Sequence, residues 1–362
     1  MNNLNFSAGP GALPQAVLDE TQRAIAMVPE AGLSLLGISH RSDWFAAVLA
    51  EAEANIRRLL DLSADYHVLF LHGGATLQFS MIPLLLLRGR TRTAEYLHTG
   101  YWSGKAIPEA QREGAVRVLW SGADSGFTRL PTDAELPCTA DAAYLHYVSN
   151  ETVEGLQFHR LPGRDDVARV CDMSSDFLGG PIDAGRFALI YAHAQKNLGP
   201  AGVTVVILHQ DLLRDAPDDL HALLDYRNHI AAQSIFNTPP VFAIYVVLLV
   251  TRWLLRDIGG LAPMAQINRA KADLLYGAID ASDGFYRGRA NATDRSLMNV
   301  VFNLPSPALD AEFLERAAAA GFHGLPGHRS LGGIRASIYN ALTLDAAAAL
   351  CEFMLDFRRR RS

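Results

Sequence analysis

The sequence has few cysteines, no long apolar run and no excess of positive charge. Its three cysteines form neither a C-x-x-C pair nor a zinc-binding spacing, and their odd number argues against a disulfide framework. The longest apolar run, Val241 to Val250, has only ten residues, whereas roughly 20 are needed to span a bilayer. The formal net charge of -6 gives no global attraction to nucleic acid. We therefore expect a protein that binds neither membranes nor nucleic acids.

The first residues also lack the basic start and the apolar core of a signal peptide. Together with the odd cysteine count, this predicts a cytoplasmic protein. Hydrophobic residues make up 49% of the chain and charged residues 19%, which is typical of a soluble globular protein. The 362 residues exceed the size at which a single core stops growing. We therefore expect a large domain over residues 1–255 and a smaller C-terminal α+β domain over residues 256–362.

Short apolar runs recur through the first part of the chain, after a helical pattern over residues 17–60. They predict strands at residues 67–71, 94–97, 116–120, 143–147, 167–171, 187–192 and 203–209. Strands this apolar indicate a mostly parallel sheet that is covered on both faces, hence an α/β fold. The C-terminal part predicts a long helix, then a strand at 299–304, a helix at 312–320, a strand at 334–338 and a last helix from about residue 345.

Three features follow predicted strands, where ligands of α/β sheets bind. The HGGAT segment at residues 72–76 closes a strand and opens a helix, Asp172 ends one strand, and Lys196 follows the next. Taken singly, a Gly-Gly turn is most often only a turn, the aspartate a helix cap and the lysine a solvent-exposed charge. Together they supply the phosphate cup, the acid for a pyridine nitrogen and the amine that pyridoxal phosphate chemistry needs.

Longer motifs, in order along the chain, support the same chemistry. They are NFSAGPGALP (5–14), SHR (39–41), LFLHGGAT (69–76), TGYW (99–102), NET (150–152), AQKNLGPAG (194–202), FNTPP (236–240) and GHRSLGGIRASIYNA (327–341). With these motifs the chain resembles the phosphoserine aminotransferases, class V enzymes of fold type I. The resemblance implies a pyridoxal 5'-phosphate cofactor and a homodimer with shared active sites. It implies amino transfer between L-glutamate and 3-phosphooxypyruvate in serine biosynthesis, and a parallel step on a phosphorylated hydroxythreonine in vitamin B6 biosynthesis.

The resemblance also assigns cofactor roles to individual residues. Lys196 matches the lysine that bonds the cofactor's aldehyde and later moves the substrate's proton, and Asp172 matches the partner of the pyridine nitrogen. Trp102 matches the aromatic residue stacked on the ring, and Thr152 a hydroxyl near the ring oxygen. The other matched positions are Gln195 beside the cofactor, Ala75 and Thr76 in the phosphate cup, and Asn237 and Thr238, which reach the phosphate from the second subunit.

Substrate binding calls for cations, because the substrate carries a phosphate and a carboxylate. Four residues match the family's substrate-phosphate cluster, namely His40, Arg41, His328 and Arg329. Arg335 matches the clamp on the α-carboxylate. Each arginine taken alone is most often a surface charge, and the surrounding motifs reverse that expectation.

Three positions depart from the family pattern. Ala8 stands where some relatives have a serine that contacts the substrate, His193 replaces a glycine just before AQKN, and Asp176 adds a negative charge near the cofactor loop. None of them removes an essential group.

Two alternatives stay open at this point. One is another fold type I activity, such as cysteine desulfuration or alanine–glyoxylate transamination. Desulfuration needs a mobile nucleophilic cysteine, whereas Cys171 falls in a predicted strand and Cys351 in a predicted helix. The other alternative is a catalytically silent cofactor-binding protein, against which the presence of both Lys196 and Asp172 argues.

Overall fold

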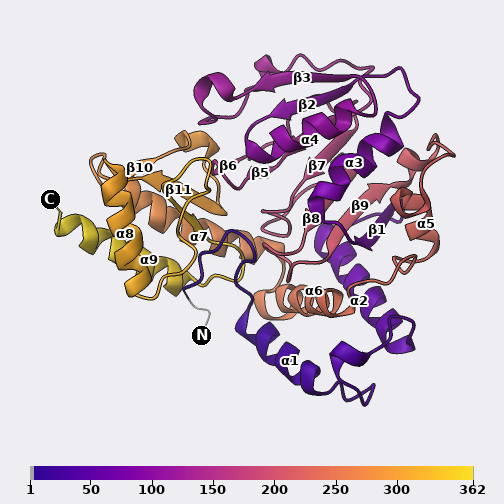
Figure 1. Cartoon of the computed structure of the whole chain (residues 1–362), viewed down its shortest axis with the longest axis horizontal. Coiled ribbons are helices and arrows are strands. Elements are labelled where there is room, and N and C mark those ends of the chain that lie inside the picture. Colours follow the sequence, from indigo (N-terminus) through magenta and orange to yellow (C-terminus); the bar gives the residue numbers. More distant parts are fainter. Residues whose placement is uncertain (1–3, 362) are drawn as a thin grey trace.

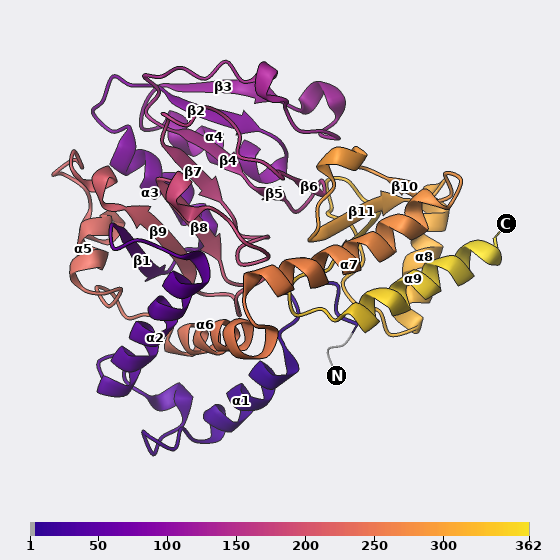
Figure 2. The same cartoon turned by 180° about the vertical axis from the view of Figure 1, so that it is seen from behind.

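A seven-stranded sheet with helices on both faces forms the larger part of the molecule (Figures 1 and 2). The computed structural model describes residues 4–361. In sheet order the strands are β1 (Tyr66–Leu71), β9 (Thr204–His209), β8 (Leu189–His193), β7 (Arg169–Asp172), β4 (Leu145–Val148), β2 (Ala94–His98) and β3 (Val116–Ser121). All neighbours pair in parallel except β9, which is antiparallel to both β8 and β1. The predicted mostly parallel α/β fold is confirmed.

The inner strands are mostly apolar because both faces of the sheet are buried there, whereas the edge strand β3 is largely exposed. On β8, Ile190 packs into one core, while Leu189 and Tyr191 pack into the core on the opposite face. The first core is closed by α1 (Gln15–Ala26), α2 (Asp43–Leu60) and α6 (Val241–Trp253), and the second by α3 (Gly74–Leu86), α4 (Tyr101–Gln111) and α5 (Tyr226–Ala231). Each buried aliphatic side chain contributes about 1.5–3 kcal/mol of transfer free energy.

The longest apolar run of the sequence forms the helix α6 in the first of these cores. Its residues from Ala243 to Thr251 are all buried by protein. Across residues 4–361, no helix is both long enough and apolar enough to cross a membrane.

The C-terminal part has a second sheet and a core of its own. Its elements are α7 (Leu261–Asp280), β10 (Arg287–Gly288), β11 (Asn299–Asn303), α8 (Pro307–Ala319), β12 (Ile334–Ser337) and α9 (Leu344–Arg359). The strands pair antiparallel in the order β10-β11-β12. Phe6, near the N-terminus, joins this core. A π-helical turn at Leu254–Ile258 and two glycines with positive φ, Gly259 and Gly260, precede α7. The domain boundary at residue 255 stays a prediction, which this break in the helix supports.

The helical pattern predicted over residues 17–60 is wrong in its middle. The chain leaves α1 after Ala26, passes through a short 3-10 turn at Leu35–Gly37 and re-enters a helix at Asp43. The Ser42 hydroxyl starts α2 by accepting the Phe45 N–H at 3.2 Å. A small ribbon of β5 (Asn150–Glu151) and β6 (Leu156–Gln157), absent from the prediction, lies beside the C-terminal sheet in Figure 2.

Candidate active site

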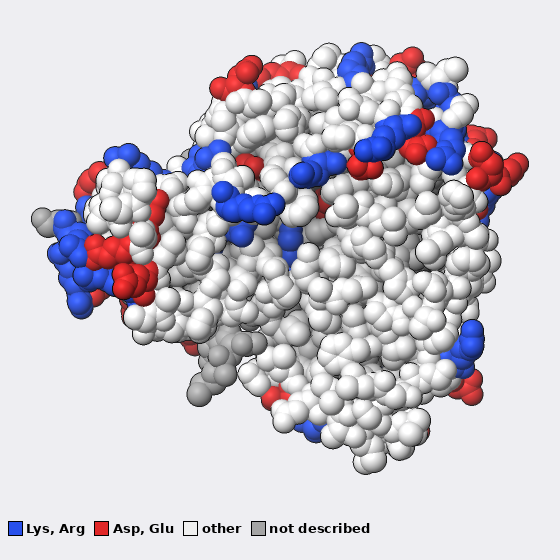
Figure 3. Space-filling model, in the orientation of Figure 1, with Lys and Arg blue, Asp and Glu red and all other residues white. Residues whose placement is uncertain are grey.

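A cavity of about 200 Å³ lies at the carboxyl ends of β7 and β8 and the N-terminal ends of α3 and α4. Figure 3 shows Lys and Arg side chains beside a hollow in the middle of the face seen in Figure 1. Six residues predicted from the sequence line this cavity, namely Ala75, Thr76, Trp102, Asp172, Gln195 and Lys196. Chain segments more than 100 residues apart in sequence therefore meet here, at the place where open α/β sheets bind ligands.

Lys196 lies in the turn that follows β8, and its side chain is buried. Its Nζ donates a hydrogen bond of 2.6 Å to Thr152 Oγ1 and lies 5.8 Å from the centroid of the Trp102 ring. Burial lowers the pKa of Lys196 to about 8; the charge of Asp172 opposes that shift, and the charge of Arg335 adds to it. An amine with this pKa is neutral often enough near pH 7 to bond a carbonyl carbon.

Asp172 ends β7 and is buried beside the same cavity. Its Oδ1 accepts the Ser174 backbone N–H at 2.8 Å. Burial raises the pKa of Asp172, whereas the hydrogen bond from Ser174 and the charge of Lys196 lower it. A carboxylate kept out of water in this way stabilises a cationic group placed beside it in the cavity.

The turn between β1 and α3 is shaped for an anion. Gly73 and Gly74 both have positive φ, and a Cβ on Gly73 would lie 2.4 Å from the Leu77 side chain. Glycine is therefore required at residue 73. No side chain caps the N-terminus of α3, so its first N–H groups, from Gly74 to Thr76, are open to the cavity.

Two buried glutamates hold the start of α4, which carries Trp102. Glu151 accepts the N–H groups of Trp102 and Ser103, both at 3.1 Å, and Glu154 accepts the Tyr101 N–H at 3.0 Å. A Cβ on Gly100 would lie 2.7 Å from each carboxyl carbon, so the two carbons are separated by at most twice that distance.

The two glutamates cannot both be ionised at neutral pH. Burial raises the pKa of both side chains, and with the added charge of Glu151 the pKa of Glu154 rises to about 8. The pair therefore retains a proton near pH 7.

Comparison with known proteins identifies the family. Residues 3–350 match the model of the class V aminotransferases. The chain belongs to this family. It is 50% identical to the phosphoserine aminotransferase of Rhodopirellula baltica, over 99% of this chain and 96% of that protein.

Solved structures agree with this assignment. The phosphoserine aminotransferase of Bacillus circulans subsp. alkalophilus superposes with a TM-score of 0.95 at 45% identity, covering 99% of this chain and 98% of that one. The PLP-bound phosphoserine aminotransferase of Trichomonas vaginalis superposes with a TM-score of 0.91 at 35% identity, covering 98% and 99%. The predicted family, fold type and transaminase class are confirmed.

Pyridoxal 5'-phosphate is the cofactor of this family, and the residues around the cavity fit it. Lys196 supplies a buried amine, Asp172 an acid for the ring nitrogen and Trp102 an aromatic face. The open N–H groups of α3 suit the phosphate. In addition, Gln195 has a buried Oε1 without a hydrogen-bond partner among the described residues, a polar atom that a ligand in this cavity would reach.

The predicted carboxylate clamp, Arg335, comes from β12 in the C-terminal sheet. Its charge lowers the pKa of Lys196. The Nε of Arg335 is buried and has no hydrogen-bond partner among residues 4–361. The ring of His328 contacts that of Tyr101, the neighbour of Trp102 in sequence, in a tilted arrangement with centroids 4.8 Å apart, and Arg329 is exposed. Arg335, His328 and Arg329 all lie outside the lining of the cavity.

Eight of the predicted residues do not line the cavity of this chain, namely Thr152, His328, Arg329, Arg335 and the four described next. Arg41, Asn237 and Thr238 are exposed and His40 is half-buried. The Thr238 carbonyl accepts a hydrogen bond from His72 Nε2 at 2.6 Å, if that nitrogen carries the proton, but its side chain stays exposed. The predicted contacts of these four residues with cofactor or substrate stay predictions.

The three departures from the family pattern lie in different places. The Ala8 carbonyl accepts the Tyr339 hydroxyl at 2.8 Å, so its backbone is already engaged. Asp176 bonds Ser149 and Gln157 and lines a separate cavity of about 400 Å³, and burial raises its pKa to about 6. His193 lines the cavity itself.

Sequence reasoning missed the glutamate pair. Glu151 falls within the NET motif, where only Thr152 received a role, and Glu154 carries no motif signal. The usable signal was two acidic residues three positions apart in an otherwise apolar segment, which is too common a pattern to predict a helix cap 50 residues away.

Proposed function

We propose that the chain is a phosphoserine aminotransferase, which transfers an amino group reversibly between L-glutamate and 3-phosphooxypyruvate. The products are O-phospho-L-serine and 2-oxoglutarate, a step of serine biosynthesis. The 50% identity to the Rhodopirellula baltica enzyme over nearly the full chain carries this proposal. The phosphohydroxythreonine reaction of vitamin B6 biosynthesis and a cytoplasmic location stay predictions from the sequence.

The chain's own residues supply proton transfer and electrostatics. When bound, pyridoxal phosphate provides an electron sink for the carbanion formed next to the substrate's amino group. Lys196, with a pKa lowered to about 8, takes the proton from the substrate α-carbon and delivers it to the cofactor carbon that receives the amino group. The Thr152 hydroxyl, 2.6 Å from Nζ, orients that amine. Asp172 keeps the ring nitrogen protonated.

Cationic residues fix the two ends of the substrate. We assign Arg335 to the α-carboxylate, because its charge acts on Lys196 and its buried Nε has no hydrogen-bond partner among the described residues. We assign His328, Arg329, His40 and Arg41 to the substrate phosphate. Arg41 is exposed and His40 lies outside the cavity lining, as His328 and Arg329 do. We assign the exposed Asn237 and Thr238 to the cofactor phosphate of a second copy, which makes the active form a homodimer.

Cysteine desulfuration is disfavoured by the thiols. None of Cys138, Cys171 and Cys351 lines the cavity, and Cys171 is fully buried in β7. Burial raises the pKa of all three thiols, so they are poor nucleophiles.

The substrate assignment is tested with two variants and two amino donors. We expect Arg329→Ala to lower kcat/KM for phosphoserine by about tenfold to a hundredfold, because one charge-assisted hydrogen bond to a dianion is lost. The effect on L-glutamate should be smaller, because its distal group carries a single charge. Arg335→Ala should impair both donors alike, since each presents an α-carboxylate to the same guanidinium.

Equal losses for both donors in Arg329→Ala would contradict the assignment. A loss confined to phosphoserine in Arg335→Ala would reverse the two ends of the pocket. If neither donor is turned over by the wild-type chain, the proposed function itself is wrong.

A further inference from the structure

We propose that His193 is an additional ligand of the cofactor's phosphate group, donating a hydrogen bond from its Nε2. This inference rests on the cofactor placement given above. It concerns a residue that departs from the family pattern and has no role in the amino transfer described so far.

The position of the ring is the first argument. His193 is the last residue of β8, three residues before Lys196, and lines the same cavity as Gly74, Ala75 and Thr76. Its Cε1 and Nδ1 lie 3.9 Å from the point where a Cβ on Gly74 would stand. The imidazole is therefore in van der Waals range of the first residue of α3, where the open N–H groups form the anion site.

The hydrogen-bond partner of Nδ1 decides which ring nitrogen carries the proton. Nδ1 lies 3.0 Å from the Oγ1 of Thr204, the residue that pairs with His193 across β8 and β9. Thr204 is fully buried, and its hydroxyl has no other hydrogen-bond partner among the described residues. If Nδ1 were the donor, the hydroxyl hydrogen would be left unpaired in the core, at a cost of about 1–3 kcal/mol. The hydroxyl therefore donates to Nδ1, and the neutral ring carries its hydrogen on Nε2.

This tautomer leaves one donor for a ligand. Nδ1 is engaged by Thr204, and apart from the contact of the ring with the Val203 backbone the described residues offer Nε2 no partner. The His193 backbone N–H is also engaged, by the Ser174 hydroxyl at 3.1 Å. The Nε2–H group is thus the remaining polar group of this residue, beside a site open to an anion.

The surrounding charges keep the ring neutral before an anion binds. Burial lowers the pKa of His193, and the charge of Lys196 lowers it further, while a hydrogen bond of the ring with the Val203 backbone opposes this shift. Asp172 at the end of β7 is the acidic side chain that lines the cavity, and α3 brings no charged side chain to it. A phosphate dianion in the cup therefore meets a neutral Nε2–H donor rather than a second cation.

The test compares cofactors with and without the phosphate. We would measure the dissociation constants of pyridoxal phosphate and of pyridoxal by equilibrium dialysis of loaded wild-type, His193→Gly and Thr204→Val proteins. His193→Gly should raise the dissociation constant of pyridoxal phosphate by about tenfold. The dissociation constant of pyridoxal should stay nearly unchanged, because His193 contacts only the phosphate. Thr204→Val keeps the imidazole but removes the hydroxyl that holds the hydrogen on Nε2. The loss of affinity should therefore be smaller than in His193→Gly, and also confined to pyridoxal phosphate. Equal weakening of both ligands, or no weakening, overturns the proposal.

A second measurement does not depend on the folding of a variant. In ¹⁵N NMR of the loaded wild-type protein, His193 Nε2 should appear as an N–H and Nδ1 as an unprotonated nitrogen. The Nε2 proton should shift when pyridoxal phosphate replaces pyridoxal. An Nδ1–H tautomer, or an Nε2 proton that does not respond to the phosphate, contradicts the proposal. Attachment of the cofactor to Lys196 is measured separately, so a failure of the His193 contact is distinguished from a failure of the cofactor site.

Discussion

Burial shifts the acid–base properties of single residues around the cavity. It lowers the pKa of Lys196, raises the pKa of Asp172 and raises the pKa of Glu154 to about 8. The lysine becomes a usable nucleophile, the aspartate requires a cation beside it, and the glutamate keeps a proton. Each consequence is one that an amino-transfer site can use.

The glutamate pair predicts a pH dependence of stability. The folded-state pKa of Glu154, about 8, lies above its ordinary value of 4.5, so the folded protein binds this proton more tightly than the unfolded chain. Its contribution to the free energy of unfolding is fully present below pH 4.5, declines as the pH rises, and is lost above about pH 8. Glu154→Gln, which mimics the neutral form, should lack this decline.

Chemical denaturation of both proteins between pH 5 and pH 9 checks the prediction. As the pH rises across this window, the free energy of unfolding of the wild type should fall relative to that of Glu154→Gln. Parallel pH profiles would show that Glu154 is ionised throughout. Glu109→Gln, a substitution on α4 itself at a half-buried side chain that ion-pairs with Arg112, serves as the control.

The sequence predicts a site residue where a motif marks it, and fails where the role depends on a contact with a distant segment. Lys196 and Asp172 follow strands that their apolar neighbours reveal, and the AQKN motif singles out the lysine. Glu154 was not predictable, because its partner, the Tyr101 N–H, lies 53 residues away and is brought beside it only by the sheet. His193 was noticed as a departure, but its tautomer depends on Thr204 in the neighbouring strand.

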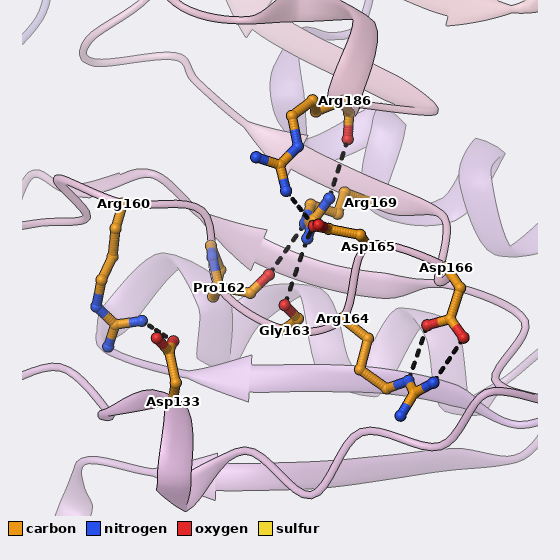
Figure 4. A network of polar contacts seen from close by, with 9 residues as sticks. All are labelled: Asp133, Arg160, Pro162, Gly163, Arg164, Asp165, Asp166, Arg169 and Arg186. Atoms are coloured by element: carbon orange, nitrogen blue, oxygen red, sulfur yellow. Dashed lines mark hydrogen bonds and ion pairs between the residues drawn. The ribbon is translucent and has the colours of Figure 1, made fainter.

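Among the elements, β7 is the strand that aims Asp172 at the cavity, and its opposite end is anchored by a buried arginine. Arg169 donates to the carbonyls of Pro162, Gly163 and Arg186 and pairs with Asp165 at 2.7 Å (Figure 4). Its side chain is 2% exposed. Three backbone carbonyls therefore depend on one guanidinium at the start of this strand.

Arg169→Met should lower the free energy of unfolding by about 3 kcal/mol, because it leaves the buried Pro162 carbonyl and two partly buried carbonyls without this donor. Arg164→Met removes a nearby arginine whose pair with Asp166 is exposed on both sides, and should change stability by less than about 1 kcal/mol. Urea denaturation of the two variants measures both values. Similar losses would show that the burial of Arg169 has no special weight.

The elements themselves were largely predictable, whereas their direction was not. Seven apolar runs predicted the seven strands of the large sheet, because burial on both faces leaves an apolar pattern. Nothing in the run at 203–209 itself shows that β9 is antiparallel. Its direction follows from the connection, because β8 reaches it through a turn rather than a crossover helix. The helical pattern over residues 17–60 hid the break before Ser42 because alanine and glutamate are frequent on both sides of it.

At the scale of the whole molecule, the C-terminal sheet contributes a charge that acts on a residue of the cavity. Lys196 and Asp172 come from the large sheet, and Arg335 comes from the C-terminal sheet. The N-terminal segment joins them, because Phe6 lies in the C-terminal core and Ala8 bonds Tyr339. The exposed Asn237 and Thr238 remain outside this arrangement, as expected of residues that serve a second copy.

A mixing experiment tests the shared site. Lys196→Ala and an Asn237→Ala/Thr238→Ala double variant should each have little activity alone. Co-expressed with separate tags and purified as mixed dimers, they should regain activity, because one of the two sites in each mixed dimer then contains only native residues. Before the mixed dimers are separated, random pairing of equal amounts would make about a quarter of all sites native. Mixed dimers without activity, or a monomer in sedimentation, would rule out residues shared between subunits.

The attachment of the cofactor to Lys196 is the central claim, and one measurement tests it directly. The purified, cofactor-loaded protein is reduced with borohydride, digested and analysed by mass spectrometry. The account predicts that the pyridoxyl phosphate group is recovered on the peptide that contains Lys196, and that Lys196→Ala retains no covalent label. Recovery of the label on another lysine, such as the buried Lys271, or its absence from the wild-type protein, would contradict the account.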